Sequence, residues 1–147
     1  MSTTGLEVFD RTLHATHIWL DEIMEKIGPD RALAWKVLST VLHKLRDRLP
    51  LELAAHLGAQ LPLLVRGAYY DQFEPTKMPE DWHSADDFIK QVAAQLTDTR
   101  TVGARDAIDA VFGVLDRHIS VGQVDKVYQA LPKGIRSLWL EPESPGQ

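Results

Sequence analysis

Apolar residues recur at intervals of three and four along the first part of the chain, a spacing typical of amphipathic α-helices. One such stripe predicts a long first helix: Phe9, Leu13, Thr16, Leu20, Ile23 and Ile27. Thr4 has the capping-box spacing to Glu7, which favours a helix start at this point. Gly28-Pro29 is a typical helix end, so the first helix is predicted to stop there.

Prolines and cap residues divide the rest of the first half into three shorter helices. Asp30 is placed to cap the second helix. Pro50 ends that helix and opens a third, for which Gly58 is the predicted C-cap. Pro62 opens a fourth helix that runs to about Tyr70.

The second half repeats this organisation after a segment, 71–83, that has no periodicity and contains two prolines. Ser84 starts the next helix, and another follows from about Thr101. Ser120 caps a short third helix, and Pro132 opens the last one. No segment alternates polar and apolar residues with a period of two, so we predict an all-α fold.

A shift of seventy residues superimposes the two halves of the chain. Six pairs of identical residues then coincide: Ala34 with Ala104, Val41 with Val111, Leu45 with Leu115, Leu61 with Leu131, Pro62 with Pro132, and Arg66 with Arg136. Self-similarity at a fixed period indicates duplication. We therefore predict an internally duplicated helical bundle of two four-helix units, each of roughly 70 residues, at about 5–70 and 84–140, joined by the loop 71–83. Because so short a unit makes a marginal core, the units are expected to pack as one domain over 1–140, followed by a flexible tail at 141–147.

The composition suits a single globular domain: 147 residues, 44% hydrophobic and 25% charged. A net charge of -5 lacks the basic surplus of a dedicated nucleic-acid binder. The basic segment KLRDR at 44–48 is interpreted as a solvated helix end whose cations complement the helix dipole. The N-terminus does not resemble a signal peptide, and no apolar run approaches the roughly 20 residues that cross a bilayer. We expect a cytoplasmic protein that binds neither nucleic acid nor membrane.

Arg66 and Arg136 occupy equivalent places in the two halves, four residues after a Leu-Pro proline and three before an aromatic residue. Two roles are open for this pair. The guanidinium groups either clamp helix-terminal carbonyls or a carboxylate while their stems pack against the protein, or they face a shared cleft and bind an anion.

The first helix also carries a stripe of metal-ligating residue types: Asp10, His14, His17 and Asp21. Steps of four, three and four place them on one side of the helix, where carboxylate and imidazole could hold zinc or another divalent ion. The alternative is a set of solvated or hydrogen-bonded side chains at the edge of the core. Residues 5–15 have no counterpart in the second half, so this stripe is an added feature. No cofactor is predicted.

Aromatic residues gather where the fourth helix meets the loop: Tyr69, Tyr70, Phe73 and Trp82. Such residues are common anchors of protein interfaces. No nucleotide-binding glycine loop and no serine-nucleophile motif occurs, so an enzyme has little support. We therefore predict a non-enzymatic interaction or scaffolding module that binds another protein or its own copy. The alternative is small-ligand, anion or divalent-metal binding in the inter-unit cleft or at the His/Asp stripe.

The segment VLHKLRDRLPLELAAHLGAQLPLLVRGAYYDQF and the later ALPKGIRSLW resemble the bacterial domain of unknown function 2267 family. The resemblance extends from about Trp19 to Trp139. It implies a small, soluble, all-helical bacterial protein of uncharacterised activity, and it supplies no catalytic residues.

Overall fold

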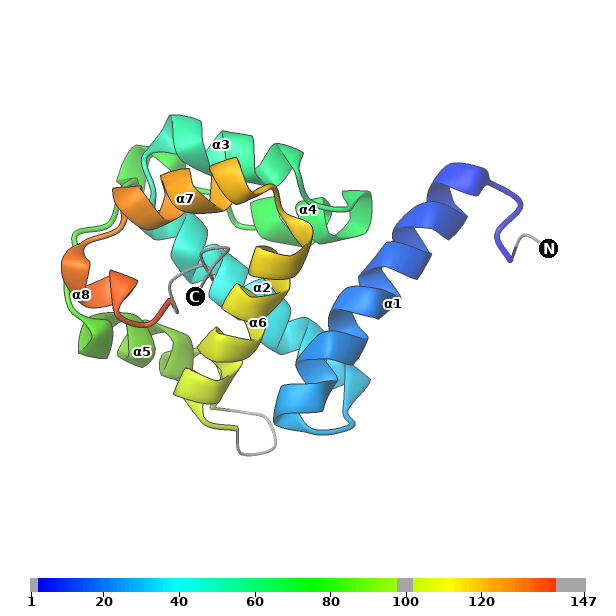
Figure 1. Ribbon diagram of the computed structural model, residues 1–147, viewed down its shortest axis with the longest axis horizontal. Helices are drawn as coiled ribbons and strands as arrows, with labels where there is room; N and C mark the ends of the chain where they lie inside the picture. The colour runs from blue at the N-terminus through cyan, green and yellow to red at the C-terminus, as the bar shows by residue number, and fades with distance from the viewer. Residues whose placement is uncertain (1–2, 98–101, 140–147) are drawn as a thin grey trace, which may run out of the picture.

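The computed structural model describes residues 3–97 and 102–139 (Figure 1). Within these ranges the chain forms eight α-helices and one short 3₁₀ helix, without strands, so the predicted all-α class is confirmed. The predicted tail at 141–147 lies outside the described residues. The elements follow in the order α1 (Glu7–Ile27), α2 (Arg31–Arg48), α3 (Leu51–Ala59), α4 (Leu63–Tyr70), η1 (Pro75–Lys77), α5 (Ala85–Ala94), α6 (Ala104–His118), α7 (Val121–Ala130) and α8 (Lys133–Arg136).

Three helix starts have the cap residues that the sequence predicted. The side chain of Asp30 accepts a hydrogen bond from the backbone N–H of Leu33 at 3.0 Å. Ser84 caps α5 and Ser120 caps α7 in the same way. Each side chain satisfies a backbone donor that has no partner inside its own helix.

Two other predicted cap residues have different roles. The capping box at Thr4 does not form, because Leu6 is the N-cap of α1 and the Thr4 hydroxyl donates to Asp10 at 2.8 Å. Gly58 does not end α3, which continues to Ala59. A Cβ atom at Gly58 would lie 2.8 Å from the ring carbon Cζ of Tyr70, so a close approach of this ring requires the glycine.

The core is built around α2 and α6, which lie in the middle of the molecule (Figure 1). Helices α1 and α5 each pack against both of them, while α3 and α7 lie side by side. Eleven residues of α2 and α6 are completely buried at this centre: Ala34, Val37, Leu38, Val41, Leu42, Leu45, Ala107, Ile108, Val111, Val114 and Leu115. Phe112 of α6 stacks on Trp139 with ring centroids 4.1 Å apart, which ties the end of the described chain to the core.

Only the C-terminal part of helix α1 is buried against the other helices. Its buried residues begin at Thr16, and every residue from Glu7 to Ala15 is at least partly exposed. In Figure 1 this N-terminal half extends away from the rest of the molecule. The C-terminal half packs on α2 and α6, where Trp19 stacks on His118 with ring centroids 5.4 Å apart.

Candidate protein-interaction surface

The predicted aromatic cluster packs against the protein's own helices. Tyr69 is fully buried, and its hydroxyl donates a hydrogen bond to the carbonyl of Ala54 at 2.7 Å. Burial raises the pKa of Tyr69 well above its ordinary value, so this hydroxyl stays protonated as a donor. Tyr70 meets the rings of Tyr69 and Phe73 edge-on, with centroids 5.0 and 5.4 Å apart.

Two arginines at the end of α2 hold the loop that carries the other aromatic residues. The buried guanidinium of Arg46 donates to the carbonyls of Tyr69 at 2.6 Å and Asp71 at 2.9 Å. Arg48 donates from Nε to the carbonyl of Trp82 at 2.6 Å. The interpretation of 44–48 as a solvated helix end is therefore wrong, because the loop folds back over this end of α2 and its backbone carbonyls bind the two arginines.

The loop aromatics complete this attachment. The guanidinium carbon of Arg46 lies 5.4 Å from the ring centroid of Phe73. Trp82 packs edge-on against Phe88, with centroids 6.2 Å apart, while the amine of Lys44 lies 5.9 Å from the Trp82 ring. Rings that are engaged in this way fix the loop to the body and offer little surface to a partner.

Arg66 and Arg136 make matching contacts in the two halves. Both donate to carbonyls at the C-terminal ends of α3 and α7: Arg66 to Gly58 (3.0 Å), Ala59 (3.1 Å) and Leu61 (3.0 Å), and Arg136 to Leu131 (2.8 Å) and Gln129 (2.7 Å). The last carbonyls of a helix lack the usual N–H partner one turn further on, so the arginines supply donors at these two helix ends. This is the first of the two roles considered for the pair, and it leaves the head groups occupied.

The four residues of the predicted metal stripe lie along one side of α1: Asp10, His14, His17 and Asp21. The structure does not bring them together, and no group of three His, Asp or Glu residues within the described ranges could hold a metal ion. Asp10 accepts hydrogen bonds from Thr4, and Asp21 forms an exposed ion pair with Arg31 at 3.7 Å. The stripe runs along the helix axis for about 16 Å, so its ends cannot share one ion.

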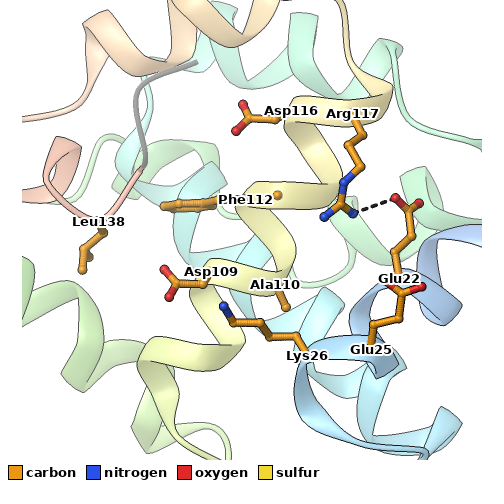
Figure 2. A pocket seen from close by; sticks show the side chains of 10 residues that line it. Glu22, Glu25, Lys26, Asp109, Ala110, Phe112, Asp116, Arg117 and Leu138 are labelled. Carbon is orange, nitrogen blue, oxygen red and sulfur yellow. Dashed lines mark hydrogen bonds and ion pairs between the residues drawn. The ribbon is translucent and has the colours of Figure 1, made fainter. Parts of the chain in front are cut away.

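An open groove of about 290 Å³ lies over α6 beside α1. Figure 2 shows Arg117 reaching from α6 to Glu22 of α1, with an ion-pair distance of 2.7 Å. The other carboxylate oxygen of Glu22 accepts a hydrogen bond from His118 at 2.5 Å. Burial opposes ionisation of Glu22, but the hydrogen bonds from His118 and Arg117 outweigh it and lower the pKa. This cluster joins the first helix to the second half of the chain.

The far side of the same groove carries Asp116, whose pKa is raised by burial. The carboxylate accepts a hydrogen bond from the indole N–H of Trp139 at 2.9 Å, which opposes that shift. Lys26 and Asp109 also line the groove, so its wall carries both signs of charge. Chemically the groove offers polar contacts, and one of its carboxylates, Glu22, is already bound by Arg117 and His118.

One group of exposed apolar residues lies elsewhere, on the N-terminal half of α1 and its N-cap. Leu6, Phe9 and Leu13 retain 51%, 48% and 36% of their accessible surface. The hydroxyl of Thr12, which follows Phe9 by one helical turn, accepts a hydrogen bond from the backbone N–H of Leu64 at 2.9 Å. This bond places the start of α4 beside the stripe.

Leu63 and Leu64 of α4 add to this surface, since they are 50% and 41% exposed. We name the five residues Leu6, Phe9, Leu13, Leu63 and Leu64 the α1–α4 patch. Sequence reasoning assigned Phe9 and Leu13 to the buried stripe of the first helix. The available signal was that residues 5–15 have no counterpart in the second half, which indicated a part of the helix that the body does not require.

No helix of the described ranges is both long and apolar enough to cross a membrane. No curated protein matches the chain. A family of uncharacterized conserved proteins, DUF2267, matches it over residues 16–138, which begins where the buried part of α1 begins. That match covers most of the 147 residues, and the chain belongs to the DUF2267 family.

Proposed function

We propose that this protein is a non-enzymatic helical interaction module that binds an amphipathic helix of a partner along the α1–α4 patch. One observation carries the proposal: Leu6, Phe9 and Leu13 continue, at steps of three and four, the stripe that α1 buries from Thr16 onwards. Inside the body that stripe packs against other helices. An apolar stripe on the same spacing outside the body is suited to the same kind of neighbour.

The borders of the patch support a helix as the occupant. Asp10 and His17 lie on one side of the stripe along α1, and Thr12 lies on the other. A narrow apolar strip with polar margins is the form in which one amphipathic helix presents itself to another. The start of α4 forms the second wall of this strip.

The apolar side chains of the projecting turns are not part of the buried core. The DUF2267 match begins at residue 16, and residues 7–15 have no counterpart in the second half of the chain. All buried residues of α1 lie at Thr16 or later. An exposed apolar stripe with no role in the fold is best explained by a role in binding.

We further infer that the body is a duplicated four-helix unit. Helix α1 packs on α2 and α6, and α5 packs on the same two helices in the other half, which is the pattern a two-fold arrangement of equivalent units would produce. The matching carbonyl contacts of Arg66 and Arg136 support the same inference. On this basis the rigid duplicated body is a support for the projecting half of α1.

Small-ligand binding has weaker support. The head groups of Arg66 and Arg136 already bind carbonyls, and Glu22 in the α1–α6 groove already binds Arg117 and His118. A ligand would have to replace these contacts. The geometry therefore favours the interaction module.

Photo-crosslinking in cells tests the proposed function. A benzophenone amino acid placed at Leu13 should give a discrete covalent adduct that disappears when Phe9→Glu is added to the same chain. The control places the same amino acid at Leu51, which is 48% exposed at the start of α3, the opposite end of that helix from the link to α4, and should give no such adduct. Absence of a Leu13 adduct, or one that persists in the Phe9→Glu chain, would refute the proposal.

A further inference from the structure

We propose that the partner helix is α1 of a second copy of this chain, packed antiparallel so that the two projecting halves cover each other's stripe. This inference rests on the proposed function, because it names the occupant of the same patch. Three features carry it: the apolar area of the patch, the dipole of α1, and the position of α4.

The area of the patch is what a two-fold dimer needs. Its five residues retain between 36% and 51% of their surface. With about 180 Å² for a fully exposed large apolar residue, each copy leaves about 400 Å² of apolar surface in water. Two copies would cover about 800 Å², and since interfaces are roughly 57% apolar, the total buried area would be about 1,400 Å². Stable complexes bury roughly 1,200 to 2,000 Å².

The dipole of α1 selects the antiparallel orientation. Glu7 and Arg11 form an ion pair with each other on α1, so these two charges do not decide how a second helix packs. A parallel pair would place both positive helix ends side by side, which is unfavourable. An antiparallel pair separates these ends and opposes the helix dipoles.

The position of α4 explains why the patch has two walls. Leu63 and Leu64 lie beside Thr12, on the body side of the projecting half. In an antiparallel pair centred between Phe9 and Leu13, the N-terminus of the partner helix points toward this body. The partner's Leu6 is then directed at the start of α4, so the α4 of each copy covers the Leu6 of the other.

The test is the mass of the purified protein in solution, measured by light scattering and sedimentation from about 1 to 100 μM. We expect a concentration-dependent rise from 16.5 kDa toward twice that value. Phe9→Glu or Leu6→Glu should raise the dissociation constant at least about tenfold, because each would bury an unpaired charge. Leu51→Glu is the matched control at an exposed apolar residue and should leave the dimer unchanged. All four proteins should have the same helical circular dichroism, since the substituted residues are exposed.

Disulfide trapping tests the orientation, because the chain contains no cysteine of its own. A Phe9→Cys chain mixed with a Leu13→Cys chain should form mainly the mixed disulfide when oxidised. Phe9→Cys and Leu13→Cys chains that each couple only with themselves would overturn the antiparallel arrangement.

The outcomes separate this inference from the proposed function. A wild-type protein that stays monomeric at every concentration, or a dimer that survives both glutamate substitutions, overturns self-association. If such a monomer still forms the Phe9-dependent Leu13 adduct in cells with another protein, the patch binds a helix of a different chain and the proposed function stands. If the adduct is also missing, both fail.

Discussion

Replacing Arg46 with methionine should cost this protein a large part of its stability. Arg46 is 2% exposed and donates to the carbonyls of Tyr69 and Asp71, the first of which is buried. Methionine fills the space of the stem but leaves both carbonyls without this donor. A buried carbonyl without a partner costs about 1 to 3 kcal/mol. Taking about 2 kcal/mol for Tyr69 and about 1 kcal/mol for the partly solvated Asp71, we expect a loss of about 3 kcal/mol.

Urea unfolding followed by circular dichroism measures this loss directly. For a domain of this size, about 3 kcal/mol corresponds to a fall in melting temperature of about 6 to 12 °C. Arg48→Met is the control, since Arg48 makes one hydrogen bond to the loop and is less buried, so its loss should be about 1 kcal/mol. A loss below about 1 kcal/mol in the Arg46 variant, or equal losses in both, would refute the reasoning that Arg46 satisfies buried carbonyls.

Two further predictions concern pH and glycine. Burial lowers the pKa of His43 below its ordinary 6.5, although its hydrogen bond to the Ala68 carbonyl opposes the shift. As the pH falls, His43 is therefore protonated in the unfolded chain before it is protonated in the folded protein. The free energy of unfolding should therefore be highest above pH 6.5 and fall below it. Measured at about pH 7.5 and 5.5, this fall should be smaller in the His43→Gln variant than in the wild type. Equal falls in the two proteins would contradict the assignment to His43. Gly58→Ala should lower the stability of the protein by about 2 kcal/mol, because the new Cβ would meet Tyr70. Gly67→Ala lies in α4, where the new Cβ meets open space, and should raise the stability by about 0.5 to 1 kcal/mol in thermal melts. The opposite order of these two melting temperatures would show that the Tyr70 contact is unimportant.

Local signals predicted much of the secondary structure. Asp30, Ser84 and Ser120 were identifiable as caps because a cap depends on residues only three positions away. Thr4 had the same spacing but failed, since Gly5 adopts a positive φ of 82° and the chain turns away before the helix starts. A spacing rule cannot detect a backbone turn of this kind.

The candidate surface depended on information that periodicity does not contain. The spacing of Phe9 and Leu13 is the same as that of Ile23 and Ile27, yet the first pair is exposed and the second is buried. A stripe reports which side of a helix is apolar, but the length of the neighbouring helices decides how much of it is covered. For the same reason Arg46 looked like a surface residue, because the loop that buries it lies more than twenty positions further along the chain.

The contact between α1 and α6 also has a consequence for the order of events during synthesis. Glu22 and Arg117 are 95 positions apart, so α6, one of the two helices that cover α1, emerges long after α1 itself. At roughly 5 to 20 residues per second, translation of the intervening chain takes about 5 to 20 s. Throughout that interval the newly made first half cannot close its core on α6. The core can therefore close only after α6 has emerged, and until then a nascent chain presents to chaperones the part of the α1 stripe that α6 covers.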